Sequence, residues 1–138
     1  LAVNIYGIPR MTADIDLLLD FEDQNVDNFE NAIKLLSYRS SVPLSLKVFV
    51  NKKERERVVK EKNMLAYSYF SAAAGYISLD VSLDVPVSFE EMWRSRTEKG
   101  SGKSVLPLVS HEHLIELKTY ANRIQDQKDV LLLSKLLK

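Results

Sequence analysis

The chain contains no cysteine, which excludes disulfide bridges, thiolate zinc sites and cysteine-based catalysis. It also lacks long apolar runs, because segments such as residues 17–19 and 131–133 are far shorter than the roughly 20 residues of a membrane-spanning helix. Its 19 basic and 19 acidic residues balance, so no overall charge draws it towards nucleic acid. We therefore expect a cytoplasmic protein, without a membrane span, that recognises any polyanionic partner through local contacts.

The composition predicts one folded globular domain over residues 1–138. A content of 46% hydrophobic and 28% charged residues argues against disorder, and a chain of 138 residues can bury one core. We find no internal repeat, low-complexity tract or linker that would divide it. The sequence begins at Leu1 without a methionine or a signal-peptide pattern, and we expect further residues upstream of it.

Alternation of apolar and polar residues predicts the strands. The clearest is residues 77–85, in which apolar side chains take one face and Ser78, Asp80, Ser82 and Asp84 take the other. Shorter alternating or apolar segments predict strands over residues 13–19, 44–50 and 105–109. A turn is expected at residues 100–102.

Helical spacing of apolar residues and capping residues predict the helices. Residues 1–6 form a helix that ends at Gly7, and Ser110 caps a helix whose apolar residues follow at helical spacing. Further helices are predicted over residues 26–36, 52–62, 89–96 and 126–137. The chain is thus expected to mix helices and strands.

Asp14 and Asp16 are the first candidates for chemistry. Two positions apart on one strand, they share a face and lie roughly 6.6 Å apart along the backbone. Two bare carboxylates at that separation repel by about 2.5 kcal/mol at an effective dielectric constant of 20. Mg²⁺, a hard cation that prefers oxygen ligands, would relieve this repulsion. The same pattern also fits two solvated acids at a sheet edge, and both readings stay open.

Asp80 is the second candidate, since it lies on the polar face of the predicted strand 77–85. If that strand neighbours the one carrying Asp14 and Asp16, three carboxylates converge and could hold two metal ions. Asp80 could also accept a proton from an attacking hydroxyl. Asp84 is roughly 13 Å further along the strand and is expected outside the cluster. A solvated acid is the alternative interpretation of Asp80.

Three basic residues could bind phosphate: Arg10 before the acidic strand, Lys118 beside the apolar stripe of its helix, and Arg123 near that helix's end. Surface cations are common, so this assignment depends on further context.

Two other motifs are set aside. Residues 100–104, Gly-Ser-Gly-Lys-Ser, resemble the end of a phosphate-binding P-loop, but Thr97 occupies the position of its first glycine and Pro107 argues against the helix that must follow. His111 and His113 point about 200° apart on a helix, so we expect surface residues and no shared metal.

The sequence resembles the nucleotidyltransferases related to the toxin subunit of abortive-infection systems, within the DNA polymerase beta-like superfamily. The resemblance is most specific in residues 4–16, Asn-Ile-Tyr-Gly-Ile-Pro-Arg-Met-Thr-Ala-Asp-Ile-Asp, which end in the pattern Arg-x-Thr-x-Asp-x-Asp. Further similar segments follow in order: residues 79–81, 87–91, 109–118 and 123–129. In such proteins a glycine turn, Gly-Gly or Gly-Ser, precedes the first of these segments, and this turn is absent from the sequence given.

The resemblance implies an α/β (α+β) fold with a mixed β-sheet flanked by helices. It implies Mg²⁺ or Mn²⁺ bound by Asp14, Asp16 and Asp80, and a nucleoside triphosphate contacted by four residues: Arg10, Thr12, Lys118 and Arg123. It implies that Asp126 and Asp129 orient basic neighbours or cap the last helix.

The activity expected from the resemblance is transfer of a nucleoside monophosphate to a hydroxyl of RNA, such as tRNA, or of a protein. A toxin role checked by an antitoxin protein is a further expectation. The alternatives are a non-catalytic module that binds a nucleotide or a protein, and a metal-dependent nuclease that uses the same acids.

Overall fold

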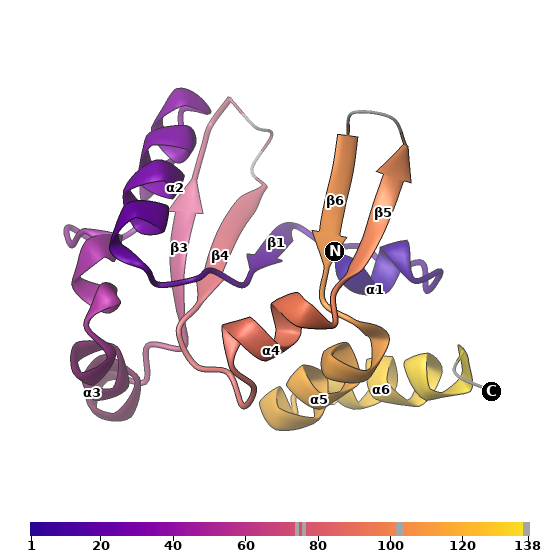
Figure 1. Ribbon diagram of the computed structural model, residues 1–138. Helices are drawn as coiled ribbons and strands as arrows, with labels where there is room; N and C mark the ends of the chain where they lie inside the picture. Colours follow the sequence, from indigo (N-terminus) through magenta and orange to yellow (C-terminus); the bar gives the residue numbers. More distant parts are fainter. Residues whose placement is uncertain (74, 76, 102–103, 137–138) are drawn as a thin grey trace. The chain divides into compact units, whose positions relative to one another are not determined.

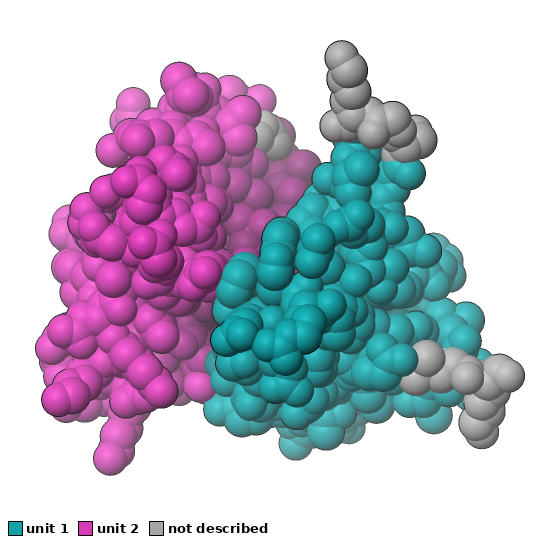
Figure 2. Space-filling view, in the orientation of Figure 1, with its two compact units in different colours: residues 1–11, 85–138 teal, residues 12–84 magenta. Residues whose placement is uncertain are grey.

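The computed structural model describes residues 1–73, 75, 77–101 and 104–136. Contacts divide the chain into two compact units, coloured separately in Figure 2. Unit 1 comprises Leu1–Met11 and Val85–Lys138, and unit 2 comprises Thr12–Asp84. The expectation of a single domain stays a prediction.

Unit 2 contains a mixed four-stranded sheet in the order β1-β4-β3-β2 (Figure 1). β1 pairs in parallel with β4, whereas β4 with β3 and β3 with β2 are antiparallel. The class predicted from the sequence, helices combined with a mixed sheet, is confirmed at this level. The strands span Asp14–Leu17 (β1), Arg39–Ser40 (β2), Ala66–Phe70 (β3) and Ser78–Ser82 (β4).

Helices α2 (Asp23–Leu35) and α3 (Lys52–Lys62), with the 3-10 helix η1 (Leu46–Val50), share the core of unit 2 with one face of this sheet. The strands contribute Tyr67, Tyr69, Leu79 and Val81 to that core, and Ile15 and Leu17 of β1 pack against it. Because side chains alternate along a strand, the even-numbered residues of β1 and β4 lie on the opposite face. That face carries the acidic residues predicted to bind metal.

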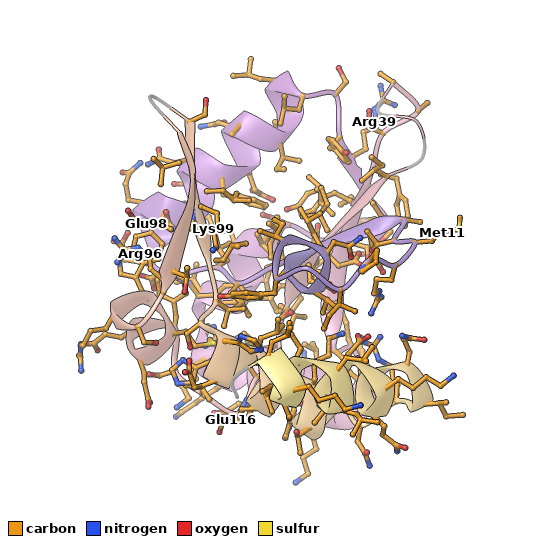
Figure 3. All side chains as sticks on the ribbon, turned by 90° about the vertical axis from the view of Figure 1, so that its right-hand side faces the viewer. Met11, Arg39, Arg96, Glu98, Lys99 and Glu116 are labelled. Atoms are coloured by element: carbon orange, nitrogen blue, oxygen red, sulfur yellow. The ribbon has the colours of Figure 1, made fainter. Side chains whose placement is uncertain are left out.

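Unit 1 contains four helices and a two-stranded antiparallel ribbon among the residues described. Val3, Leu114 and Leu133 form its small core. At the ribbon, Arg96 and Glu98 form an ion pair of 2.8 Å (Figure 3). The elements are α1 (Ala2–Ile5), α4 (Phe89–Arg94), β5 (Thr97–Ser101), β6 (Ser104–Leu108), α5 (His111–Ala121) and α6 (Ile124–Leu136).

Most helix predictions are confirmed within a few residues. Gly7 follows α1 with a φ of +97°, a conformation that glycine adopts without the strain of a side chain. The Ser110 side chain caps α5 by accepting a hydrogen bond from the backbone N–H of His113. α6 begins two residues before the predicted start, and residues 137 and 138 lie outside the described residues.

The strand predicted over residues 44–50 is wrong. Most of this segment is η1, in which the buried residues Leu46 and Phe49 are spaced three apart, matching the three-residue period of a 3-10 helix. The Ser45 hydroxyl accepts a hydrogen bond from the N–H of Lys47 and starts this helix. Three strands, β2, β3 and β5, were not predicted.

The turn predicted at residues 100–102 is wrong for its first two residues. Gly100 and Ser101 belong to β5, and Gly102 lies outside the described residues.

Among the residues described, no helix is long and apolar enough to cross a lipid bilayer.

Candidate metal centre

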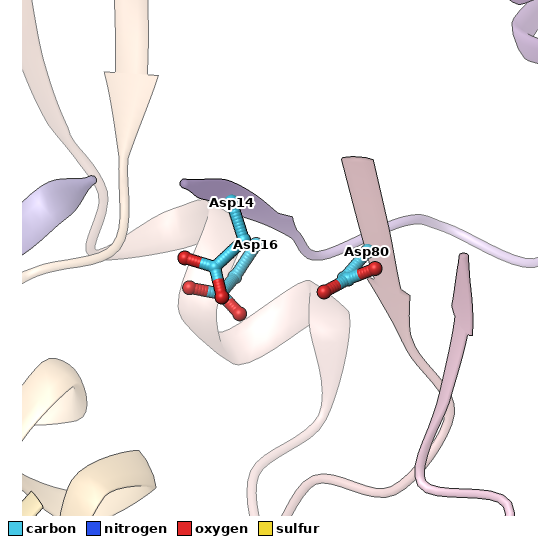
Figure 4. Close-up of side chains that lie close together, drawn as sticks. All are labelled: Asp14, Asp16 and Asp80. Atoms are coloured by element: carbon cyan, nitrogen blue, oxygen red, sulfur yellow. The ribbon is translucent and has the colours of Figure 1, made fainter. Parts of the chain in front are cut away.

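The pairing of β1 with β4 brings three acidic side chains together on one face of the sheet. Asp16 lies opposite Asp80, and Asp14 lies opposite Ser78, in the parallel register. Asp14, Asp16 and Asp80 each offer a carboxylate oxygen, and these oxygens all lie within 4.8 Å of one another (Figure 4). The convergence of carboxylates expected from the sequence is therefore present within unit 2.

Asp80 is the carboxylate of the cluster with an unsatisfied buried atom. Its Oδ1 is shielded from solvent and accepts no hydrogen bond from any described residue. A buried polar atom without a partner costs about 1–3 kcal/mol, and more when it belongs to a charged group. A cation bound between β1 and β4 would supply the missing partner.

Asp14, by contrast, accepts a hydrogen bond from a neighbouring side chain. Thr12 Oγ1 lies 2.7 Å from Asp14 Oδ1 and 3.1 Å from the backbone carbonyl oxygen of Asp14. The carboxylate is the closer acceptor and carries the charge, so it is the stronger one for the single hydroxyl hydrogen. Thr12 thus contacts a predicted metal ligand directly.

The donor set fits a hard divalent cation. Two oxygens bound to one Mg²⁺ at 2.0–2.1 Å are at most about 4.2 Å apart, when they lie on opposite sides of the ion. The three oxygens lie within 4.8 Å of one another, so small side-chain rotations would bring them around an ion. At separations of 4.8 Å or less, each pair of carboxylates repels by at least about 3.5 kcal/mol at an effective dielectric constant of 20, and a cation offsets this repulsion.

The predicted phosphate-binding cations belong to a separate cluster in unit 1, built around Asp126 and Asp129 of α6. Both carboxylates are only 1% exposed. Lys118 Nζ lies 2.7 Å from Asp126 and 3.2 Å from Asp129, and Arg10 pairs with Asp129 at 2.5 Å. Arg123 Nε lies 2.6 Å from Asp126. The expectation that the two acids orient basic neighbours is confirmed by these ion pairs.

Three cations contact the two carboxylates of this second cluster. Burial raises the pKa of Asp126, whereas hydrogen bonds and charge interactions with Arg123 and Lys118 lower it. The lowering effects together are larger, so the pKa of Asp126 lies below its usual value. The Lys118 side chain is 14% exposed and that of Arg123 is 73% exposed. Arg123 is therefore the cation of the cluster that solvent reaches most easily.

The structure thus divides the predicted site residues between the two units. Unit 2 holds Asp14, Asp16, Asp80 and Thr12, and unit 1 holds the three cations. Sequence reasoning missed Gln125, whose side-chain amide donates a 3.1 Å hydrogen bond to Asp129. The spacing of four residues on one helix could have indicated this contact.

The two histidines, predicted to be surface residues, are half-buried. His111 Nε2 lies 3.0 Å from the carbonyl oxygen of Leu133, and its ring packs 4.8 Å from that of Tyr6. The His113 side chain is 14% exposed and contacts Ser95 through Nδ1 at 3.0 Å. Both rings instead connect α5 to its neighbours in unit 1.

The P-loop interpretation of residues 100–104 stays excluded, because Ser104–Leu108 is a strand where a P-loop requires a helix.

Comparison with known proteins gives no family: no protein-family model matches the chain, and no curated protein is similar enough to count as a relative.

Proposed function

We propose that Asp14, Asp16 and Asp80 bind a divalent cation, Mg²⁺ or Mn²⁺, together with a nucleoside triphosphate, and that the chain transfers the nucleoside monophosphate to a hydroxyl of RNA or protein. One observation carries the proposal: three carboxylates from β1 and β4 converge, and a buried oxygen of Asp80 has no hydrogen-bond partner among the described residues. Such a donor set favours a hard cation and the phosphate oxygens that accompany it.

A cation in this cluster would neutralise charge on the phosphate groups and lower the pKa of an attacking hydroxyl. The protein's own contribution would be to position the reactants. In the transfer, the hydroxyl oxygen forms a bond to the α-phosphorus, the bond from that phosphorus to pyrophosphate breaks, and Asp80 accepts the hydroxyl proton. Asp14 and Asp16 would hold the ion while charge develops on the phosphoryl group.

The resemblance to abortive-infection nucleotidyltransferases supports the finer parts of the proposal. On that basis we assign the chain the polymerase beta-like fold, a cytoplasmic location and a toxin role controlled by an antitoxin protein. The same resemblance assigns Arg10, Lys118 and Arg123 to the triphosphate. Their support within unit 1 is an ordered set of cations around two buried carboxylates.

The proposal is tested by incubating the chain with each α-³²P-labelled ribonucleoside triphosphate, Mg²⁺ and either a tRNA pool or a protein mixture. We expect label to enter a macromolecule with release of pyrophosphate, and to fall to background when Asp14→Ala and Asp16→Ala are combined. Asp20→Ala, which removes an acid of unit 2 outside the cluster, is the matched control.

The other outcomes identify the alternatives. Triphosphate binding without incorporation of label would favour a non-catalytic nucleotide-binding module. Cleavage of RNA in the absence of any triphosphate would favour a nuclease that uses the same acids. Either result would contradict the proposed transfer.

A further inference from the structure

Thr12, which precedes β1, donates a hydrogen bond to one carboxylate of the acidic cluster. Its hydroxyl lies 2.7 Å from Asp14 Oδ1, and among the described residues Asp14 is the carboxylate of the cluster that receives a side-chain hydrogen bond. We propose that Thr12 is a positioning residue that fixes the Asp14 carboxylate in the orientation needed to bind the cation. This inference rests on the proposed function and changes the role expected for Thr12, from contacting the nucleotide to orienting a ligand.

The geometry allows Asp14 to serve both partners at once. A carboxylate has two oxygens and about four acceptor positions, so a hydrogen bond to Oδ1 leaves Oδ2 and a second lone pair of Oδ1 for a metal ion. The hydroxyl supplies one hydrogen, and its bond to a charged acceptor is among the stronger kinds of hydrogen bond. Thr12 can therefore hold the carboxylate without blocking it.

The residue type suits this task. A β-branched side chain such as threonine has few accessible χ1 rotamers, so its hydroxyl loses little freedom when it points at one acceptor. The Thr12 hydroxyl oxygen also lies 3.1 Å from the carbonyl oxygen of Asp14, so both of its nearby acceptors belong to residue 14. Asp16, which is exposed, shows no comparable contact among the described residues, and Asp80 keeps an unpartnered oxygen. Orientation of the cluster by a side-chain hydrogen bond is thus concentrated at Asp14.

The test measures the affinity for Mn²⁺ alone, by electron paramagnetic resonance of the free ion, in the wild-type chain and in Thr12→Val and Thr12→Ser. Partners that orient a metal ligand typically contribute 10–100-fold in affinity, so Thr12→Val is expected to weaken Mn²⁺ binding by about that factor. Thr12→Ser keeps the hydroxyl and is expected to restore most of the affinity.

Thr119→Val is the matched control, because Thr119 also donates a hydroxyl hydrogen bond of 2.8 Å, to the carbonyl oxygen of Ile115 in unit 1. It should leave Mn²⁺ affinity unchanged. Equal affinity in Thr12→Val and the wild type would overturn the positioning role and leave the metal site intact. A wild-type chain that does not bind Mn²⁺ would overturn the proposed function and this inference together.

Discussion

Replacing Asp14 with asparagine is expected to lower Mn²⁺ affinity by at least about 100-fold, since loss of a ligand should cost no less than loss of a partner that orients one. The same substitution is expected to raise the free energy of unfolding of the metal-free protein, because it removes one of three mutually repelling charges. Each pair repels by at least about 3.5 kcal/mol at separations of 4.8 Å or less and an effective dielectric constant of 20, and solvent screening should reduce the gain to about 1 kcal/mol.

The opposite signs of these two effects make the experiment diagnostic. A substitution that merely damaged the fold would lower both metal affinity and stability. Urea unfolding at low ionic strength, with and without Mn²⁺, measures the stability change, and 1 M salt should remove most of the gain in the metal-free protein. Asp20→Asn is the control outside the cluster. Unchanged Mn²⁺ stabilisation in Asp14→Asn would show that the ion binds elsewhere.

Replacing Asp126 with alanine is expected to destabilise the protein by about 3–5 kcal/mol, the cost typical of breaking a buried ion pair by removing one partner. Lys118 would remain largely buried and, among the described residues, would keep only Asp129 as its counter-ion. Asp126 also accepts a hydrogen bond from the backbone N–H of Arg123, and this hydrogen bond would be lost as well. Urea unfolding monitored by circular dichroism measures the loss.

A milder pair of variants keeps this prediction testable if Asp126→Ala does not fold. Asp126→Asn preserves the shape and should cost less. Adding Lys118→Met should recover part of the loss, because it removes the largely buried ammonium group that has lost one of its two carboxylate partners. Glu116→Ala, an exposed acid on α5 (Figure 3), is the control. A loss below about 1 kcal/mol in Asp126→Ala would contradict a buried network of this kind.

The same carboxylate should make stability depend on acid. The pKa of Asp126 is lower in the folded than in the unfolded chain, so its contribution is complete above the unfolded value of about 4 and is lost as the pH falls through the folded value. Asp126→Asn should therefore show a shallower loss of unfolding free energy below pH 4 than the wild type.

The strand positions of the acids in the candidate site were predictable from the local sequence pattern, but their proximity in space was not. Period-two alternation assigns Asp14, Asp16 and Asp80 to polar strand faces without knowledge of any partner. That β1 lies beside β4 in a register matching Asp16 to Asp80 depends on contacts between distant segments, and no local signal specifies it. From the sequence alone, the metal hypothesis could be stated only on the condition that the two strands are neighbours.

The errors in the fold prediction have physical causes. The alternation of Leu44, Leu46, Val48 and Val50 favoured a strand. Leu44 and Val48 are instead partly exposed, and burial of Leu46 together with Phe49 requires a helical period. Conversely, β3 was not predicted although its buried Tyr67 and Tyr69 alternate with Ser68. Aromatic residues at alternating positions were the available signal for that strand.

The ion-pair network of unit 1 was predictable in part. Asp126 and Asp129 are three residues apart on one helix, so both can face the same neighbours, and Arg123 lies one turn before Asp126. The pair between Arg10 and Asp129 joins residues 119 positions apart and depends on how α1 and α6 pack. Local spacing can therefore place Arg123 near these carboxylates, whereas their role in orienting cations was expected from the family resemblance. Neither indicated that Arg10 would be among those cations.

The most direct test of the central claim is calorimetric titration of the four ribonucleoside triphosphates, with and without Mg²⁺, into the wild-type chain and into the combined Asp14→Ala and Asp16→Ala variant. We predict binding that requires Mg²⁺ and disappears in the variant, which would locate the nucleotide at the carboxylates of β1. Binding that is independent of Mg²⁺, or equally strong in both proteins, would contradict the assignment of these acids to a metal-nucleotide site.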